Sequence, residues 1–473
     1  MPDLTRLIEA AQAGDPVRVR LICRDAFLDP EFSVFATCGN PAGLDQIQTP
    51  GTTLASETRS LVVRVMCFEL CSVVFTQMMA IPLGSADSSQ VAVALPIHFI
   101  ALSYLIYRRA AIVDPTRLLL YVGMAATAII FHIRLSDGSY SPTSLALFIC
   151  IYSTYIFVIP IERADYIRVV KFFILIATVA SCLVWLDWLT QIVGLGKIDL
   201  YHVLPRPFQY RDYNYLKRFW FGPIRIQPNG IIFLESSHVS QFIAMALVCE
   251  IVLFMRIKRM LFLGLSLLGT IGGSGLGVAL LTFPFLLPKL RGPLLLGVIV
   301  GAPVAIVLAL QIGLVDNIAR RTTEFDKADG SANLRFIAPM QAVAQAATGP
   351  VDDFLLGKGA GTMPRGKSFL KAFTWAPYSK VIVEYGAICA VFWFFLTCFG
   401  TFRRGVPFAI SWSLFIQYHL MNGSLNVPLH TIYIFVLSGA YIISERSEGS
   451  EKRRVPVRYD RENSFRLTGK QFD

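Results

Sequence analysis

Positively charged side chains gather in segment 195–228, between two long apolar runs, where only Asp199 and Asp212 oppose them in charge. Arginine and lysine bind phosphate oxygens through charge-assisted hydrogen bonds, and flat aromatic rings suit the face of a sugar. We therefore predict that this segment binds a sugar phosphate, with anchoring of its aromatic rings at a membrane interface as the alternative. The candidates for substrate binding are Arg206, Arg211, Arg218 and Trp220.

Arg225 leads from this segment into the sequence IQPNGIIFLESSHVSQF. We expect that sequence to open an apolar span, with Glu235 one to two turns inside its outer boundary. An ionisable residue at that depth is a functional candidate, although a structural ion pair between Glu235 and an arginine would give the same sequence. His238 follows on the same helical face. Glu235 and His238 supply only two ligands, so we predict no metal site.

A second candidate segment, 314–378, is long for a connection in a compact protein, and such loops are usually functional. It contains SANLR, which ends in Arg335, and DDFLLGKGAGTMPR, whose glycines surround Lys358 and precede Arg365. A glycine-rich turn can bind an anion through backbone N–H groups. The lysine-serine pair of a nucleotide-binding loop is missing, so we predict an anion site and no nucleotide site.

Where the chain enters its next apolar run, YSKVIVEYG contains Tyr378, Lys380 and Glu384. Lys380 and Glu384 are four residues apart, hence on one helical face. Two interpretations stay open: an ion pair near the interface, and a charged site facing a lumen. Asp187, between two tryptophans near the outer end of an earlier run, raises the same choice. Tyr378, Lys380 and Glu384 join Lys358 and Arg365 as substrate-binding candidates.

The elements that position these residues are predicted to be membrane helices. The chain is 54% hydrophobic and 16% charged, with a mean hydropathy of +0.56, whereas soluble domains carry about a quarter charged residues. Its apolar residues form runs near the length that spans hydrocarbon. We predict an all-α polytopic membrane protein of about twelve transmembrane helices. The expected spans are 61–82, 90–107, 117–134, 143–161, 169–194, 230–255, 260–272, 275–288, 293–313, 379–399, 404–421 and 427–443.

The net charge of +11 comes largely from short connections and the C-terminal tail, where the positive-inside rule expects basic residues. We therefore predict the lipid bilayer and no nucleic acid as a partner, with both termini cytoplasmic. The expected organisation is a partly disordered tail 1–59, a transmembrane domain 60–445 with external loops 195–228 and 314–378, and a basic tail 446–473. The basic short connections include Arg108, Arg109, Arg117, Arg163, Arg168, Lys171, Arg256, Lys258, Arg259, Lys289, Arg291, Arg403 and Arg404.

Two of the expected spans, 260–272 and 275–288, are short and meet at GGSGLG, residues 272–277. They form either a tight helical hairpin or one bent helix. Counting them as two keeps the later basic connections on one side, which favours the hairpin. The glycine pattern resembles a dinucleotide fingerprint, but its position between apolar runs predicts close helix packing or a bend.

Four short motifs, in their order and placement, resemble those of the Wzy-type polysaccharide polymerases and O-antigen ligases of bacterial envelopes, more specifically the exopolysaccharide-polymerase branch. The resemblance covers about residues 60–445 and includes a very large external loop late in the chain. The motifs are FTQMMAIPLG at the end of the first span, IQPNGIIFLESS after Arg225, SANLR followed by LLGKGAGT, and KVIVEYG.

The resemblance implies a fold related to the integral-membrane GT-C glycosyltransferases, in the inner membrane of a bacterium. It implies polymerisation of undecaprenyl-diphosphate-linked oligosaccharide repeat units at the periplasmic face, for exopolysaccharide or O-antigen synthesis. The enzyme would be a glycosyltransferase that needs no metal and no cofactor. The implied partners are a chain-length-regulating copolymerase and a flippase.

Carried over by motif, Arg225 and Arg335 match the arginines of the two external loops, and Glu235 matches the acidic residue after the first. These three are the catalytic candidates. The arginines would stabilise the leaving diphosphate, and Glu235 would act as the base or orient an arginine. O-antigen ligases carry a histidine just before the re-entry helix, where this chain has FTWAPYSK. This difference favours a polymerase and leaves the base unassigned.

Three alternative functions remain open. An O-antigen ligase differs from a polymerase mainly in its acceptor. A transporter or flippase for lipid-linked glycans predicts charges in the middle of several spans and internal repeats, whereas the ionisable residues here lie toward the outer ends. A glycosyltransferase that uses lipid-phosphate sugars needs carboxylates in its first external loop, and loop 83–89 holds only Asp87.

Overall fold

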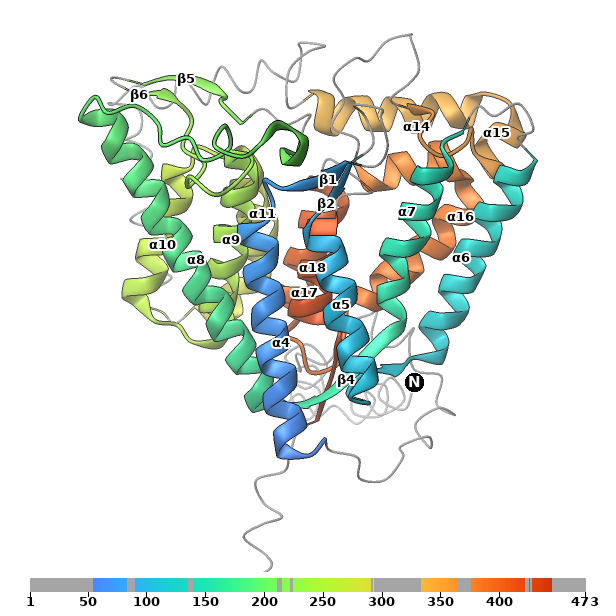
Figure 1. Ribbon diagram of the computed structural model, residues 1–473, viewed down its shortest axis with the longest axis horizontal. Coiled ribbons are helices and arrows are strands. Elements are labelled where there is room, and N and C mark those ends of the chain that lie inside the picture. Colours follow the sequence, from blue (N-terminus) through green and yellow to red (C-terminus); the bar gives the residue numbers. More distant parts are fainter. Residues whose placement is uncertain are drawn as a thin grey trace, which may run out of the picture.

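The computed structural model describes residues 54–82, 90–134, 140–210, 215–221, 224–290, 292, 333–363, 376–421, 425 and 428–444. Figure 1 shows a bundle of helices that run between two ends of the molecule. Its helices are α4 (Ser56–Phe75), α5 (Ala94–Tyr107), α6 (Pro115–Ile133), α7 (Pro142–Ser153), α8 (Arg163–Ile192), α9 (Ser236–Leu253), α10 (Ile257–Gly269), α11 (Gly273–Leu286), α14 (Ala338–Thr348), α15 (Val351–Leu356), α16 (Pro377–Thr401), α17 (Phe408–Ile416) and α18 (Pro428–Ile434).

Each expected span within the described residues contains one of these helices, whereas the span expected at 293–313 lies outside them. Four helices are long and apolar enough to cross a membrane: α6, α8, α9 and α16. Helices α5, α7, α11 and α18 are apolar but shorter. The helical membrane character is therefore supported, and the count of about twelve crossings stays a prediction.

Capping residues explain where two of these helices begin. Asp114 precedes α6, and its carboxylate accepts hydrogen bonds from the backbone N–H groups of Thr116 and Arg117. Ser141 precedes α7, and its hydroxyl accepts from the N–H of Ser144. Proline occupies the first helical position of both, where its missing N–H costs nothing.

The described structure is mostly helical, as predicted, but several short segments form strands that the sequence did not predict. The span expected at 143–161 stops being helical after η1 (Thr154–Ile156) and continues as strand β4 (Phe157–Glu162). Strand β4 pairs antiparallel with β3 (Ile112–Val113) and parallel with β7 (Tyr441–Ser444), which follows α18 and η7 (Phe435–Gly439). The other pairs are β1 (Ala80–Pro82) with β2 (Gln90–Ala92), and β5 (Arg218–Phe221) with β6 (Ile224–Ile226). These strands cap the ends of the bundle.

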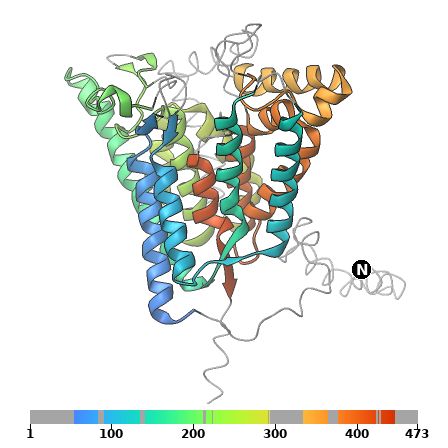
Figure 2. The same cartoon turned by 45° about the vertical axis from the view of Figure 1, so that its right-hand side comes forward.

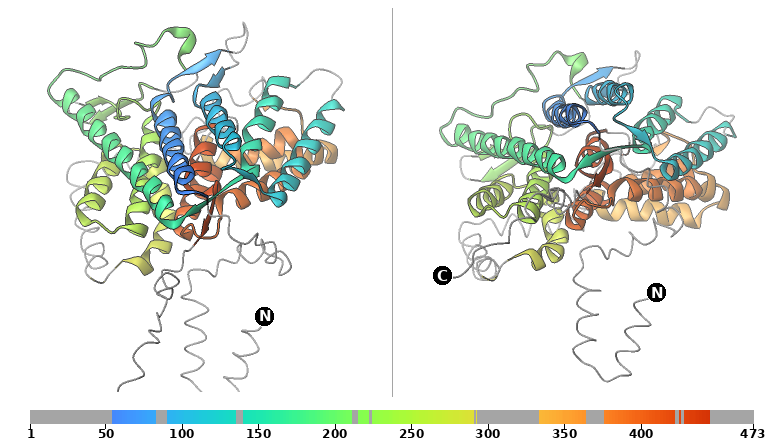
Figure 3. Two further views of the ribbon diagram at one scale, coloured as in Figure 1. Left: turned by 60° about the horizontal axis from the view of Figure 1, so that its bottom comes forward. Right: turned by 90° about the horizontal axis from the view of Figure 1, so that it is seen from below.

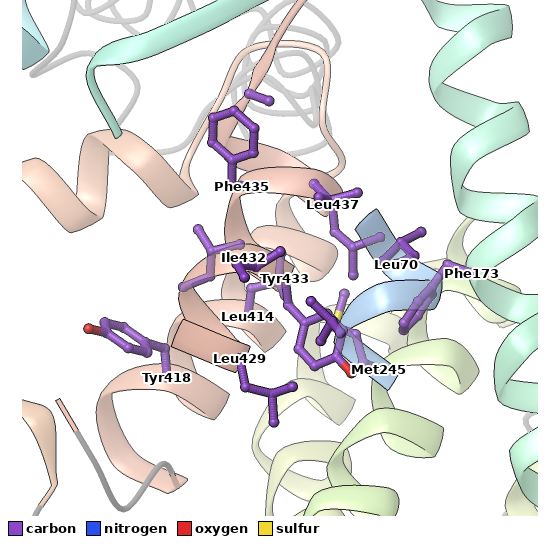
Figure 4. Packing of buried hydrophobic residues seen from close by; sticks show 14 of the residues in the cluster. Leu70, Phe173, Met245, Leu414, Tyr418, Leu429, Ile432, Tyr433, Phe435 and Leu437 are labelled. Atoms are coloured by element: carbon purple, nitrogen blue, oxygen red, sulfur yellow. The ribbon is translucent and has the colours of Figure 1, made fainter. Parts of the chain in front are cut away.

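The core lies where early and late helices meet. Seen from below, α18 lies inside the bundle (Figure 3), in contact with α4, α5 and α7. Because α18 has neighbours all round, nearly all its described side chains are buried. Figure 4 shows the packing, in which Leu70 of α4, Phe173 of α8 and Met245 of α9 lie close to Leu414, Leu429, Ile432, Tyr433 and Leu437.

Arg117 of α6 links segments that are far apart in the chain. Its side chain is fully buried and donates hydrogen bonds to the carbonyls of Tyr155, Phe399 and Gly439 at 2.7–2.9 Å. These three carbonyls offset most of the cost of burying a guanidinium, and Nε lies 3.8 Å from the Asp114 carboxylate without a hydrogen bond. The interpretation of Arg117 purely as a topology signal is therefore incomplete, because the same arginine joins α6 to the C-terminal segments.

The two ends of the bundle carry different structures. In Figures 1 and 2 the β1–β2 and β5–β6 pairs, α14 and α15 lie at the upper end, which we call the loop end. The start of α4 and strand β4 lie at the lower end. The described part of the chain therefore starts and finishes at the end opposite to the loop end.

The pair of short spans expected at 260–272 and 275–288 forms two helices, as the hairpin alternative predicted. Helices α10 and α11 both pack on α9 and are joined through Ile271, which has a positive φ of 52°. A Cβ on Gly272 would lie 2.4 Å from the hydroxyl of Ser240, and one on Gly275 would lie 2.3 Å from its carbonyl oxygen. The glycines of GGSGLG therefore permit close packing of α11 on α9, as predicted.

Candidate functional site

Glu235 lies at the start of α9 and not inside it. The residue is the N-cap, with extended backbone angles, and the helix begins at Ser236. The helix does not begin at residue 230 as expected, because residues 230–234 form a turn in which Gly230 and Ile231 have positive φ. The depth of Glu235 in the membrane stays a prediction. The Glu235 carboxylate makes no capping bond and accepts from the Ser237 hydroxyl at 2.8 Å.

Arg335 reaches this carboxylate from the other candidate segment. It lies on η4 (Asn333–Ile337), a π-helical turn that leads into α14, and its Nη2 is 3.7 Å from Oε2 of Glu235. Both side chains are about a fifth exposed, at 22% and 23%. Two of the three predicted catalytic residues are thus an ion pair, linking residues a hundred positions apart at the loop end.

Polar groups continue from this pair into the bundle. The ring of His238 lies 6.1 Å from that of His430 on α18, measured between centroids. The Nε2 of His430 lies 2.9 Å from Oε1 of Gln241, and the Gln241 amide donates to the carbonyl of Met421. His430 and Gln241 are buried. Sequence reasoning missed His430, whose nearness to His238 depends on the packing of α18 against α9.

The third catalytic candidate, Arg225, occupies strand β6 with its side chain exposed, and its backbone N–H donates to the side chain of Gln191. Arg206 is also exposed, on η2 (Arg206–Phe208). Arg218 and Trp220 belong to β5, and their side chains are outside the described part of the structure, as is all of Arg211. Of the three predicted catalytic residues, Arg335 and Glu235 form an ion pair in the described structure.

A buried network fixes the base of the 195–228 segment. The ammonium of Lys197 lies 2.7 Å from Oδ2 of Asp187 and 2.7 Å from Oδ1 of Asn229. Asp187 also accepts from the N–H of Asn229, and Gln191 donates to it. Burial lowers the pKa of Lys197, and the nearby Asp187 carboxylate opposes this shift. Asp187 and Lys197 are therefore a structural pair, not phosphate ligands.

Some aromatic residues of the segment also have structural roles. Tyr201 stacks on Tyr215 with 5.0 Å between ring centroids, and the Lys197 ammonium lies 5.6 Å from the centroid of Tyr215. Tyr215 packs with Met78 and Leu234 in a small separate core, and burial raises its pKa to about 12. These rings pack beneath the segment and support it. Only the exposed residues of the segment are therefore available to contact a ligand.

The IQPNG motif joins the packed base of this segment to the hairpin of α10 and α11. The Gln227 amide donates to the carbonyl of Ile271, at 2.7 Å, at the junction of α10 and α11. The Asn229 amide donates to the carbonyl of Phe233 at 2.6 Å. A Cβ on Gly230 would lie 3.3 Å from Val184 and Val239. The motif thus positions Glu235 at the start of α9.

The glycine-rich turn of LLGKGAGT does not offer its N–H groups to a ligand. Lys358 and Gly359 donate to the carbonyls of Val383 and Glu384, both at 2.9 Å. The N–H of Ala360 donates to the Nε2 of His132, at 2.6 Å. The N–H of Met363 lies 3.3 Å from Oε1 of Glu384. The predicted external anion site is wrong here, because these donors bind protein groups, including the carboxylate of Glu384.

Lys380 and Glu384 form the ion pair that their spacing predicts, with 4.0 Å between Nζ and Oε2. Glu384 is fully buried and Lys380 nearly so, at 12% exposure. Tyr378 is half-buried and packs against the core, and the side chain of Lys358 is exposed. Arg365 lies outside the described residues. The role of Glu384 is thus to join the glycine-rich turn to α16.

The remaining observations concern ligands and relatives. Among the residues that the structure describes, there is no group of three or more His, Cys, Asp or Glu side chains that could hold a metal ion. Comparison with protein-family models, curated proteins and solved structures found no match for this chain. The candidate site therefore consists of Arg335, Glu235 and His238 at the loop end, with Arg225 exposed on β6.

Proposed function

We propose that the chain is an integral-membrane glycosyltransferase that polymerises lipid-diphosphate-linked oligosaccharide repeat units at the loop end. The observation that carries the proposal is the ion pair of Arg335 with Glu235. It joins the two segments that the resemblance assigns to the reaction. An arginine that is only partly buried keeps donors accessible to a diphosphate, which it can bind bidentately with a permanent charge.

In the proposed reaction a hydroxyl oxygen of the acceptor sugar attacks the anomeric carbon of the donor. The bond from that carbon to the diphosphate oxygen breaks, and the diphosphate leaves with the electron pair. Arg335 stabilises the growing negative charge on the leaving group. The exposed Arg225 of β6 is the second cation. The hydroxyl proton passes to a base.

The ion pair supports a role for Glu235 in orienting Arg335. A carboxylate that stabilises a neighbouring guanidinium is a weaker base than a free one, because the cation favours its charged form. His238, in the first turn of α9, is within electrostatic range of both Glu235 and Arg335. A neutral imidazole is a suitable base for a sugar hydroxyl. We therefore assign His238 as the base, in place of the missing histidine before α16.

The experiment is an assay of lipid-linked chain length in cells that carry Arg335→Ala, Glu235→Gln or His238→Ala. We expect Arg335→Ala to lower polymer by about 100-fold, the usual cost of removing a donor that stabilises transition-state charge. Single repeat units should accumulate on the lipid carrier. The Glu235→Gln change should reduce polymer less, and its combination with Arg335→Ala should add little, since both act through one cation.

Arg134→Ala is the matched control, because Arg134 is exposed and pairs with the exposed Asp352 of α15 at the same end. It should retain polymer. Undiminished polymer in Arg335→Ala cells with normal amounts of membrane-inserted protein would contradict the proposal. Long chains that remain on the lipid carrier would instead identify a ligase. Repeat units trapped on the cytoplasmic leaflet would identify a flippase.

A further inference from the structure

Helices α4 and α5 form an antiparallel pair whose outer face is hollowed. The two helices lie side by side in Figures 1 and 2. Between them runs a groove of ≈ 380 Å³, lined by apolar side chains that include Val65, Phe68 and Ile100. Phe68 is 59% exposed and Ile100 is 70% exposed. In a membrane-spanning bundle this outer face meets lipid chains.

The groove continues into a polar hollow of ≈ 630 Å³ near the start of α4. Arg64 and Tyr104 line both spaces, and Arg108, Ser60 and Glu57 line only the polar one. Arg108 directly follows α5, and its Nη1 lies 3.5 Å from the hydroxyl of Tyr104. The combined site therefore has two halves. One is apolar, and the other contains two guanidinium groups and one carboxylate.

The pair is held together beneath the groove. Glu69 of α4 and His98 of α5 are both buried, and Nδ1 of His98 lies 2.9 Å from Oε2 of Glu69. This contact joins the two helices on the side away from the groove's exposed residues. The groove is therefore formed before any ligand arrives, which lowers the entropy that binding must offset.

We propose that this groove binds an anionic phospholipid. Its phosphate lies at Arg64 and Arg108, and one acyl chain lies between Phe68 and Ile100. Arginine on a lipid-facing helix surface is costly unless a polar partner is within reach, and a phosphate provides a bidentate one. The apolar half matches the acyl chain and the basic half matches the headgroup charge. A lipid with a neutral headgroup matches only the apolar half of the site.

The site is separate from the candidate active site. Arg64 and Arg108 lie toward the end of the bundle opposite to the loop end, where α4 starts and α5 finishes. The lipid-linked diphosphate of the proposed reaction would lie at the loop end, so the groove selects a lipid of the other leaflet. The inference therefore stands whether or not the chain is a polymerase.

Native mass spectrometry of the purified full-length protein in detergent tests the proposal, with phosphatidylglycerol and phosphatidylcholine as probes. We expect phosphatidylglycerol to bind the wild type. The double variant Arg64→Gln, Arg108→Gln should bind this lipid at least about tenfold more weakly, since each basic residue contributes to attraction of anionic lipid. Binding of phosphatidylcholine should be weak in both proteins. Ile100→Trp, which fills the apolar half, should weaken phosphatidylglycerol binding independently.

Arg404→Gln is the matched control, because Arg404 is exposed between α16 and α17 and is not part of the groove. It should leave binding unchanged. Equal binding of phosphatidylglycerol to the wild type and the double variant would overturn the proposal. So would equal loss in the Arg404→Gln protein. A dimer that Ile100→Trp dissociates, without any loss of lipid, would assign the groove to a second copy and would also overturn it.

Discussion

At the scale of single residues, charge in this chain has two separate uses. The side chains of Asp187, Lys197 and Arg117 are buried and bound to protein groups. Arg206 and Arg225 are exposed at the loop end. From sequence alone these residues look equivalent, because composition and spacing do not report burial. A charge becomes structural only when the fold supplies its partners.

The pair of Asp187 and Lys197 gives a prediction about stability. We expect Lys197→Met alone to lower the free energy of unfolding by about 3–5 kcal/mol, because it leaves the Asp187 carboxylate buried without a cation. Combining it with Asp187→Asn should restore most of the loss. Thermal unfolding of the purified protein in detergent measures both effects.

The control for this prediction is the ion pair of Asp199 with His202 in the same segment, which is exposed to solvent. Asp199→Asn should cost at most about 1 kcal/mol, as exposed pairs do. Similar losses for Asp199→Asn and Lys197→Met would contradict a special role for burial.

At the scale of elements, the sequence predicted which segments contain helices but not how their ends are used. A long apolar run predicts a helix because only a helix of that length satisfies its own backbone hydrogen bonds across hydrocarbon. Such runs do not report that 230–234 forms a turn, which places Glu235 at the N-cap of α9. Ile231 has a positive φ and donates its N–H to the Asn229 side chain, a local turn that hydropathy does not report.

The junction of α15 with α16 shows the same limit. Gly357 and Gly386 have φ of 85° and 83°, and a Cβ on Gly386 would lie 2.3 Å from the carbonyl oxygen of Leu355. The glycines of LLGKGAGT suggested an anion cradle, and the motif KVIVEYG suggested an ion pair. That the two motifs pack on each other is visible only in three dimensions.

We expect Gly386→Ala to destabilise this junction strongly, because the methyl group adds a backbone clash to the strain of a left-handed conformation. Gly194→Ala is the matched control, since Gly194 has φ of 81° with no atom within 4 Å of its Cβ position. The control should cost about 1–2 kcal/mol, the strain alone. Limited proteolysis of 350–363 and thermal unfolding report the difference. Equal losses in both variants would show that the close packing contributes nothing.

At the scale of the whole molecule, the most useful prediction was that segments 195–228 and 314–378 lie at the same end of the bundle. The described parts of 195–228 and 314–378 lie at one end of the bundle, and the start of α4 and strand β4 lie at the other. The contact of Arg335 with Glu235 follows from that arrangement. The small sheet of β3, β4 and β7 was not predicted, because its strands lie within or beside apolar runs that read as helix.

The orientation in the membrane can be tested by cysteine labelling in a background without the native cysteines. We expect Met340→Cys on α14, where Met340 is 64% exposed, to react in intact cells with a maleimide that does not cross the inner membrane. Lys258→Cys, exposed in the first turn of α10, should react only after the membrane is permeabilised. Labelling of Lys258→Cys in intact cells would contradict either the predicted orientation or the predicted number of spans.

Arg117 and the pairing of β4 with β7 have a consequence for biogenesis. Two of the three carbonyls that satisfy this guanidinium belong to Phe399 and Gly439, and β4 gains its parallel partner only from residues 441–444. Arg117 can therefore complete these hydrogen bonds only after the segments that contain Phe399 and Gly439 have been made. Burial of that charge therefore requires the segment around Gly439, so a copy in which this segment is missing or unpacked would expose Arg117.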